Sequence, residues 1–364
     1  MAERVVLHIG SMKSGTSFVQ NVLGDNKDKL AADGVLFPGH RWRAQITAVQ
    51  DIIATGGPDQ EPTAPDGPWS KLTDEINAWS GTAVVSMEFL GPRTVDQIRR
   101  IAASFPGARV EVVLTCRDLG RQIPAMWLES MQNGATTSWA DYLVAVRAED
   151  RSVPSGRQFW RHQAIPGIAR KWSKGVGADH FTIVTVPPPG AEPGLLWERF
   201  SSVLGIEPTS CDTDVRANPS IGLATAEVLL RLNRRMINDD GTMPRGYDKY
   251  VKHLLAKRGL VHRQSQEPRL GLNESWVKKR GLAQVERLKD DGHRIVGDLA
   301  DLVPRAVNGV HADAVSLDAQ LDAAVDGMIH LIETVTETER RQRRAARTAT
   351  KNRAAADRGE RGDS

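Results

Sequence analysis

Short apolar runs separated by longer amphipathic stretches mark the first 210 residues of the chain. Each run is rich in β-branched residues and is too short for a typical helix, a pattern that indicates strands buried on both faces of a sheet. The four runs cover residues 5–9, 83–86, 110–115 and 181–186. The sequence therefore predicts four buried strands in this part of the chain.

The stretches between the predicted strands have the spacing of amphipathic helices. Residues 17–30 follow the first run, and residues 94–104 precede the third. Strands that alternate with helices form βαβ units, whose strands are parallel and whose helices cover both faces of the sheet. We therefore expect an α/β protein with a three-layer α/β/α fold around a central parallel sheet. In such sheets ligands bind at the carboxyl ends of the strands.

From about Leu223 onward the strand patterns stop, and apolar residues recur at the three-to-four spacing of helices. We expect a core over residues 1–210, a helical C-terminal extension over residues 211–335 that packs on it, and a disordered tail over residues 336–364. The tail is rich in arginine and has few apolar residues to bury. The four helical segments are 226–236, 247–259, 276–292 and 317–335.

Two further segments are expected to connect or cap these elements. Residues 56–67 are dense in proline, glycine and aspartate, which predicts a surface loop. Asn218 and Ser220 stand just before the first C-terminal helix. Capping of that helix is their expected role, and a contact with a nucleotide is the alternative.

Composition narrows the function classes. The formal net charge is +3, and the segment from Arg340 supplies much of the basic excess, so the balance gives little support to specific nucleic-acid binding. The two cysteines, Cys116 and Cys211, have no spacing typical of a zinc site or a disulfide framework, which favours a reducing, cytoplasmic location. The first apolar run is too short for a signal peptide, and no stretch approaches the ~20 apolar residues of a membrane span.

The loop after the first predicted strand carries the candidate chemistry. It reads Gly-Ser-Met-Lys-Ser-Gly-Thr-Ser over residues 10–17 and leads into a helix. Free amides at a helix start favour a phosphate or sulfate. Gly15 lets the backbone approach a ligand, Thr16 and Ser17 add hydroxyl donors, and Lys13 adds a mobile positive charge. The sequence therefore predicts a phosphate cradle here.

This loop is not a Walker A motif, because its lysine precedes the last glycine instead of following it. The order of a strand, then Lys-Ser-Gly-Thr-Ser, then a helix resembles the 5′-phosphosulfate-binding loop of the PAPS-dependent sulfotransferases, where PAPS is 3′-phosphoadenosine-5′-phosphosulfate. The resemblance covers roughly residues 4–206, including a later strand and helix that begin with Phe-Thr-Ile-Val-Thr-Val. It implies a P-loop-like fold and PAPS as the sulfuryl donor.

The next two predicted strands continue this resemblance. In the family, one strand ends at the catalytic base, a helix follows, and the next strand delivers an arginine that binds the 3′-phosphate. Here the second run ends at Glu88, and the third ends at Arg117. The planar guanidinium of Arg117 suits a dianionic phosphate, and Arg121 would share its face in a helix. The family's common serine eight residues later is Ala125 here, and Ser130 is a candidate substitute.

Two residues compete for the role of general base. Glu88 stands where cytosolic members of the family have histidine and heparan-type enzymes use glutamate, and desolvation can raise a carboxyl pKa towards neutrality. His40 follows the first helix and has a suitable ordinary pKa. Lys13 is expected to stabilise the bridging oxygen, and the amides of residues 14–17 to hold the 5′-phosphate; the scheme requires no metal. His8 is expected to be a satisfied core residue.

The resemblance implies sulfuryl transfer from PAPS to a hydroxyl or amine of a small molecule, glycan or lipid, with adenosine 3′,5′-bisphosphate (PAP) as product. The alternatives are a nucleotide-dependent phosphotransferase and a non-catalytic nucleotide-binding or anion-binding protein on the same fold. Two roles are open for the tryptophans that follow Arg117: they could form a surface for an adenine ring or an apolar acceptor, or they could pack in the core. The acceptor and the oligomeric state stay open. These tryptophans are Trp127, Trp139, Trp160 and Trp172.

Overall fold

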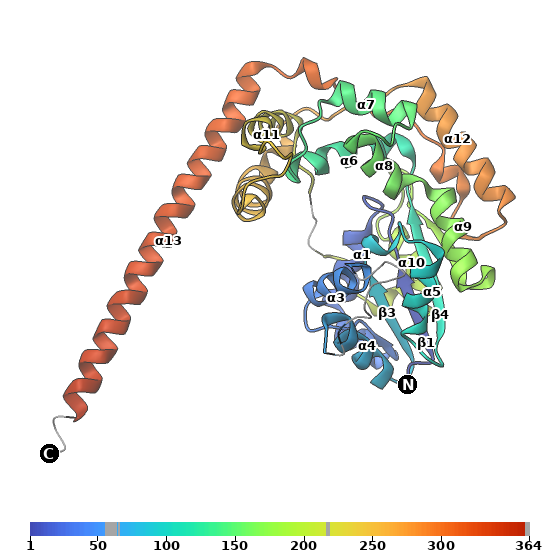
Figure 1. Ribbon diagram of the computed structural model, residues 1–364, viewed down its shortest axis with the longest axis horizontal. Helices are drawn as coiled ribbons and strands as arrows, with labels where there is room; N and C mark the ends of the chain where they lie inside the picture. The colour runs from blue at the N-terminus through green and yellow to red at the C-terminus, as the bar shows by residue number, and fades with distance from the viewer. Residues whose placement is uncertain (55–63, 65, 216–218, 361–364) are drawn as a thin grey trace. The chain divides into compact units, whose positions relative to one another are not determined.

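The computed structural model describes residues 1–54, 64, 66–215 and 219–360 of the chain (Figure 1). Most of the expected loop over residues 56–67 lies outside the described residues, as do Asn218 and residues 361–364. The chain divides into two compact units. The first unit consists of residues 1–127, 137–218 and 271–308, and the second of residues 128–136, 219–270 and 309–364.

A six-stranded parallel sheet forms the centre of the first unit. Its strand order is β2-β3-β1-β4-β5-β6, and every neighbouring pair is parallel. The four strands predicted from the apolar runs are all present, as β1, β3, β4 and β5. The strands are β1 (Arg4–His8), β2 (Val35–Leu36), β3 (Thr82–Ser86), β4 (Arg109–Cys116), β5 (Phe181–Thr185) and β6 (Arg294–Val296).

Helices cover both faces of this sheet, so the predicted three-layer α/β/α fold is confirmed. Because side chains alternate along a strand, Val5 and Leu7 of β1 pack into one apolar layer and Val6 into the other. The first layer is covered by α3 (Trp42–Ala54), α4 (Pro68–Ala78), α5 (Val95–Ala103), α9 (Ile165–Val176) and α12 (Ser275–Asp290). The second is covered by α1 (Thr16–Asp25), α2 (Lys27–Ala32) and α10 (Leu195–Leu204).

The helices predicted beside the first and third strands are present, with one break. α5 begins after Thr94, which forms a capping box with Gln97. The helix expected over residues 17–30 is instead divided into α1 and α2 at Asn26. The side-chain amide of Asn26 donates to Val22 O at 2.9 Å and to Asp212 O at 2.8 Å. This side chain competes with regular helix hydrogen bonding at the break.

Two strands carry no signal in the sequence. β2 has two residues and β6 has three, and both lie at edges of the sheet, where short strands are common. We expected only helices after Leu223, so β6 corrects that expectation. Residues 271–308, which contain α12 and β6, belong to the first unit and not to a separate C-terminal part.

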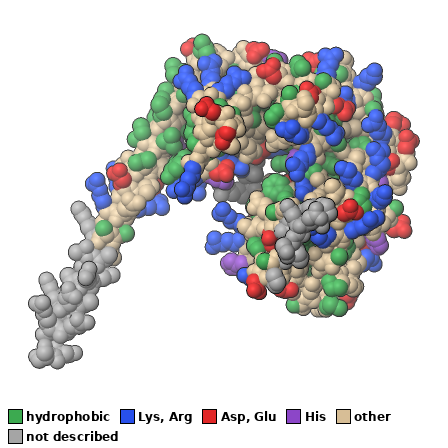
Figure 2. Space-filling model, in the orientation of Figure 1, with side chains coloured by type: hydrophobic (Ala, Val, Ile, Leu, Met, Phe, Trp, Pro, Cys, Tyr) green, Lys and Arg blue, Asp and Glu red, His purple; other side chains and the backbone are tan. Residues whose placement is uncertain are grey.

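The second unit is helical. Residues 336–360, expected to be a disordered tail, continue the long helix α13. Exposed apolar side chains, among them Leu321, Met328 and Ile332, run along the first half of α13 (Figure 2). The helices of the second unit are α11 (Leu223–Met236), the π-helix η4 (Asp248–Leu260), η5 (Val261–Ser265), η7 (Ala312–Ala314) and α13 (Leu317–Glu360).

The remaining elements belong to the first unit, apart from the end of α6, which belongs to the second unit. They are η1 (Glu88–Leu90), α6 (Leu119–Gln132), α7 (Trp139–Ala148), α8 (Pro154–Gln163), η2 (Ala178–His180), η3 (Pro208–Ser210) and η6 (Leu299–Leu302).

Candidate functional site

The strand order brings three chain segments together at one edge of the sheet. β3 and β4 pair with β1 on its two sides. The loop over residues 10–15 leaves the end of β1, Glu88 follows the end of β3, and Arg117 follows β4 directly. The carboxyl ends of parallel strands are the usual place for a ligand. The candidate site is therefore the edge formed by these three strand ends.

Buried hydroxyl and imidazole groups hold the inner side of the loop. Ser14 is fully buried, and its Oγ lies 2.5 Å from Ser11 O and 2.7 Å from Thr115 Oγ1. The two ring nitrogens of His8 lie 2.7 Å from Ser86 Oγ and 3.1 Å from Thr115 Oγ1. Burial lowers the pKa of His8 to about 3, so the imidazole is neutral at neutral pH. His8 is thus the core residue expected, and the Ser14 hydroxyl braces the loop from inside.

Three glutamines that the sequence analysis did not single out also hold this edge. Nε2 of Gln122 and Nε2 of Gln163 donate to Met12 O at 3.0 and 2.9 Å. Nε2 of Gln20 donates to Ser86 O at 3.2 Å and to Glu88 Oε2 at 3.1 Å. All three glutamines are buried. A neutral amide on a helix has no distinctive pattern, which is why the sequence carries no signal for these contacts.

Lys13 has a left-handed backbone conformation, with φ 63°. A residue other than glycine pays about 1–3 kcal/mol for such a conformation, and strained residues of this kind concentrate at functional sites. Neighbouring contacts hold it in place. Arg117 Nη1 donates to Lys13 O at 3.3 Å, and the preceding carbonyl is the one bound by the two glutamines.

Two glycines allow close approaches to this loop. Gly10 has φ 93°, and a Cβ built on it would lie 2.8 Å from Cβ of Glu88. Gly15 has φ 78°, and a Cβ there would lie 2.4 Å from Cδ2 of Leu196 on α10. Any larger residue would therefore meet both backbone strain and a clash. Glu88 lies directly against the start of the loop.

The start of α1 presents the amides expected of a phosphate cradle. The N-cap is Gly15, which has no side chain to cap the helix, and the first turn contains no acidic residue. The first helical hydrogen bond runs from Val19 N to Gly15 O, so the amides of Thr16 and Ser17 precede it. Such amides, with the positive end of the helix dipole, favour an anion.

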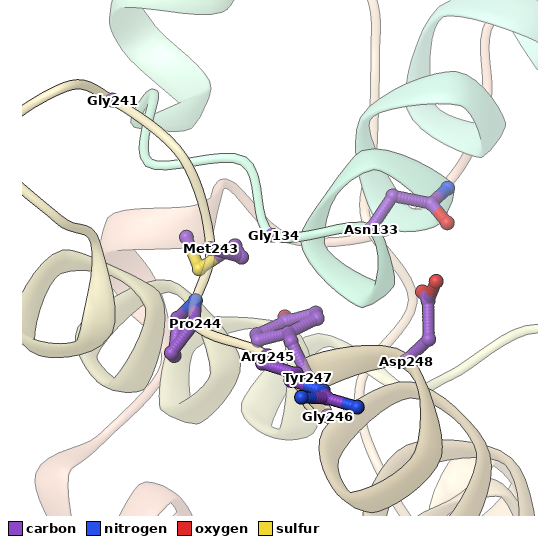
Figure 3. A pocket seen from close by; sticks show the side chains of 9 residues that line it. All are labelled: Asn133, Gly134, Gly241, Met243, Pro244, Arg245, Gly246, Tyr247 and Asp248. Atoms are coloured by element: carbon purple, nitrogen blue, oxygen red, sulfur yellow. The ribbon is translucent and has the colours of Figure 1, made fainter.

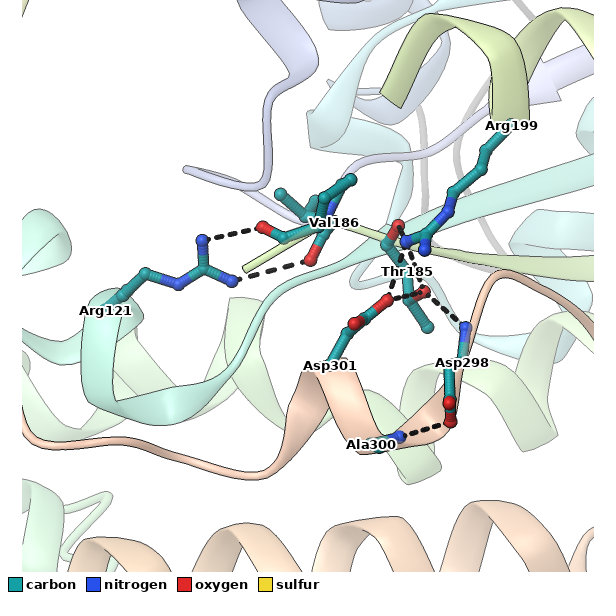
Figure 4. A network of polar contacts seen from close by, with 8 residues as sticks. Arg121, Thr185, Val186, Arg199, Asp298, Ala300 and Asp301 are labelled. Carbon is teal, nitrogen blue, oxygen red and sulfur yellow. Dashed lines mark hydrogen bonds and ion pairs between the residues drawn. The ribbon is translucent and has the colours of Figure 1, made fainter. Parts of the chain in front are cut away.

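Arg117 and Arg121 have different surroundings. Burial, followed by the nearby Arg121, lowers the pKa of Arg117 to about 10, while Asp118 acts in the opposite direction. Nε of Arg117 is buried without a partner among the described residues. Arg121 is instead engaged on all sides, because its Nε pairs with Asp118. Its Nη atoms donate to Pro187 O at 2.9 Å and Val186 O at 3.4 Å (Figure 4).

The two candidate bases are also placed differently. Glu88 is half-buried at the start of η1 and accepts the hydrogen bond from Gln20. His40 is exposed on the turn between β2 and α3. The residue before it, Gly39, donates its N–H to both carboxylate oxygens of Glu75 at 3.1 and 3.0 Å. Within the described residues His40 makes no hydrogen bond to the loop, so Glu88 is the better placed of the two.

The remaining predicted residues lie as follows. Ala125 is half-buried on α6, and Ser130 belongs to the second unit, so the structure does not relate Ser130 to Arg117. The four tryptophans are at most 3 % exposed, and the core role, one of the two considered, is confirmed. Among them, Trp172 donates Nε1–H to Gly91 O at 2.9 Å.

A second polar cluster lies at the ends of β5 and β6 (Figure 4). Arg199 Nη1, from α10, lies 2.6 Å from Asp301 Oδ2 and 3.0 Å from Thr185 Oγ1. The Thr185 hydroxyl donates to Asp301 Oδ2 at 2.8 Å and accepts from Asp298 N at 3.1 Å. Both charged side chains are mostly buried, at 15 % and 12 % exposed. This cluster ties the segment after β6 to α10 and β5, and its charges are paired.

The second unit has an open hollow of about 510 Å³ (Figure 3). It is lined by Asn133, Gly134, Gly241 and residues 243–248, and none of the predicted site residues is among them. Among the residues that the structure describes, no group of three or more histidine, cysteine or acidic side chains is placed to hold a metal ion. In the same residues no helix is both long enough and apolar enough to span a membrane.

Comparisons with known proteins leave the function to be inferred from this chain. No protein-family model matches the sequence, and no curated protein matches it. Among solved structures, a sulfotransferase from Alicyclobacillus acidocaldarius is similar to this chain: the match covers 60 % of this chain and 88 % of that one, with a TM-score of 0.35 and 13 % sequence identity. At this level of similarity, the residues of the site have to carry any functional conclusion.

Proposed function

We propose that the chain is a PAPS-dependent sulfotransferase that moves a sulfuryl group to a hydroxyl or amine of a small molecule, glycan or lipid. The observation that carries the proposal is the strand order β3, β1, β4. It brings Glu88, the loop with Lys13, and Arg117 to one edge of the sheet, in the arrangement that the transfer needs. The chemistry requires an anion cradle, a base and a cation for a second phosphate.

The donor would be held at two places. Of the expected amides of residues 14–17, the loop and the start of α1 offer those of residues 15–17 to the 5′-phosphosulfate together with the charge of Lys13, because Ser14 N already donates to Ser11 O at 3.3 Å. Arg117 suits the 3′-phosphate, because its mostly buried guanidinium has a buried Nε without a partner among the described residues, and a dianion would compensate its charge. Arg121 acts indirectly, since its contacts with Asp118 and two carbonyls fix the start of α6 beside Arg117.

The proposed transfer is a single displacement at sulfur. The acceptor oxygen or nitrogen forms a bond to sulfur while the bond from sulfur to the bridging oxygen of the 5′-phosphate breaks. Glu88 accepts the acceptor's proton, and Lys13 stabilises the charge that grows on the bridging oxygen, which leaves with PAP. Most of the rate enhancement would come from positioning and electrostatic stabilisation.

The direct test is transfer of radiolabel from sulfur-labelled PAPS to a panel of alcohols, phenols, sugars and amines. We expect labelled product from PAPS in the presence of a chelator and none from ATP labelled at its terminal phosphate. Transfer from ATP with a strict requirement for Mg²⁺ would contradict the proposal and establish a phosphotransferase instead. PAP binding without turnover of any acceptor would favour a non-catalytic binding protein.

A further inference from the structure

Arg93 is a buried cation that the donor site does not use. It lies between η1 and α5 and is only 5 % exposed. Its backbone N–H donates to Gly91 O at 2.9 Å, but its guanidinium makes no hydrogen bond or salt bridge among the described residues, and Nε is fully buried. An isolated buried charge costs several kcal/mol, so native proteins normally pair such groups.

Among the described residues, the titratable neighbours of Arg93 are basic residues, Arg161 and His162, and not acids. Arg161 and His162 are in the last turn of α8. Burial and then Arg161 lower the pKa of Arg93. Burial, Arg161 and Arg93, in that order, lower the pKa of His162 to about 4. Basic residues at a helix C-terminus complement the helix dipole, which accounts for Arg161 and His162 but not for the buried Arg93.

This cluster adjoins the reacting end of the donor site. Gln163, the residue after His162, donates to Met12 O, directly before Lys13. On the other side, Gly91 N donates to Glu88 O at 3.2 Å, and a Cβ built on Gly91 would lie 3.0 Å from Ile9 O at the end of β1. Arg93 therefore follows the proposed base by one short turn, whereas Arg117 enters the site from β4, on the opposite side of β1 from β3.

We infer that Arg93, Arg161 and His162 form an anion-binding subsite for the acceptor, which accordingly carries a sulfate, phosphate or carboxylate group near the hydroxyl or amine that is modified. This inference rests on the proposed function and narrows its substrate class from any hydroxyl or amine to acidic acceptors. The guanidinium of Arg93 binds the anion, and the charge of Arg161 reinforces its positive field. The His162 imidazole, neutral at neutral pH, is available as a hydrogen-bond donor to the anion.

The test is a calorimetric titration of PAP-saturated protein with inorganic sulfate as the probe. Saturation with PAP occupies the donor cradle, so sulfate reports on the second subsite. We expect measurable binding to the wild type, at least tenfold weaker binding to Arg93→Met, and a loss of about threefold in Arg161→Ala, whose side chain is exposed. The control is Arg100→Met, because Arg100, on α5, is half-buried and its guanidinium donates to Ile52 O at 2.9 Å.

Thermal stability supplies a second readout that does not need a ligand. Removing an unpaired buried charge with a methionine of similar length should leave the melting temperature unchanged or raise it, whereas Arg100→Met should lower it. Sulfate affinity equal in wild type and Arg93→Met, or equal loss in the Arg100→Met control, would overturn the inference. A drop in melting temperature for Arg93→Met as large as that of the control would assign Arg93 a structural role instead.

Kinetics with acidic and neutral acceptors distinguish a failure of this inference from a failure of the proposed function. For a matched pair of acceptors that differ only in an acidic group, we expect the wild type to favour the acidic one in kcat/KM, and Arg93→Met to reduce that preference at least tenfold. Turnover without any such preference would contradict the subsite and leave the sulfotransferase proposal standing. Failure of PAP to bind the wild type would contradict the donor proposal, while sulfate titration of the PAP-free variants would still decide on Arg93.

Discussion

The carboxyl edge of the sheet carries two polar clusters that differ in how their charges are compensated. At β5 and β6, Arg199 pairs with Asp301, and Thr185 satisfies both. At β3, β1 and β4, neither Arg93 nor Arg117 forms a salt bridge among the described residues; the Arg93 guanidinium makes no hydrogen bond there, and that of Arg117 donates to Lys13 O. Paired charges hold elements together, whereas a buried cation without an acid can be compensated by a bound anion. The two clusters therefore differ in whether their arginines are paired with an acid.

The largest expected effect is on turnover and comes from removing the proposed base, Glu88, in the cluster at β3, β1 and β4. Glu88→Gln preserves the side chain's size and can keep a contact with Gln20, so PAP affinity should change little. Because general base catalysis contributes about 10²–10⁴-fold, turnover should fall by that factor. The measurement is kcat with saturating PAPS and acceptor. A rate close to wild type would move the role to His40 or remove it altogether.

Lys13→Ala should have the next largest effect. Loss of one electrostatic stabiliser of a leaving oxygen typically lowers kcat by about 10²–10³-fold. Alanine also keeps the strain of the left-handed backbone, so the variant isolates the charge. Single-turnover kinetics with labelled PAPS checks this prediction, with Lys27→Ala, whose amine donates to Gly39 O, as a matched lysine control. Equal losses in the two variants would show that the effect is general and not specific to the loop.

Substitutions in the paired cluster at β5 and β6 should lower the stability of the protein and leave its affinity for PAP unchanged. Arg199→Met leaves Asp301 mostly buried without its partner, which should reduce the free energy of unfolding by about 2 kcal/mol. Urea denaturation measures the loss, and calorimetry should find PAP affinity unchanged. Full stability of this variant, or loss of PAP binding, would contradict a purely structural role for the cluster at β5 and β6.

Most of the sheet could be predicted from the sequence, and its edges could not. β1, β3, β4 and β5 are buried on both faces and therefore appear as β-branched runs. β6 is three residues long and follows a charged turn, so its pairing with β5 depends on tertiary contacts that no local pattern reveals. The arginine-rich segment has few apolar residues to bury, so it contains no pattern from which the continuation of α13 could be predicted.

The candidate site divides in the same way. Lys13, Glu88 and Arg117 follow predicted strands and could be singled out from the sequence, whereas the strand order that brings them to one edge is known only from the structure. Arg93 stands in an irregular segment after a short 3-10 turn, where nothing in the sequence reports burial. Gln122 and Gln163 act on a backbone carbonyl through a contact distant in sequence. Such residues become visible only when burial and hydrogen-bond partners are known.

The most direct test of the central claim is calorimetry of PAP binding to the wild type, Arg117→Ala and Arg121→Ala. Charged hydrogen bonds contribute about 1.5–3 kcal/mol each, so we predict that Arg117→Ala weakens PAP binding about 10–100-fold. Arg121→Ala, which removes an arginine already engaged with Asp118 and two carbonyls, should have a smaller effect on affinity. No detectable PAP binding by the wild type, or equal affinity in the wild type and Arg117→Ala, would contradict the assignment of a PAPS site to this edge of the sheet.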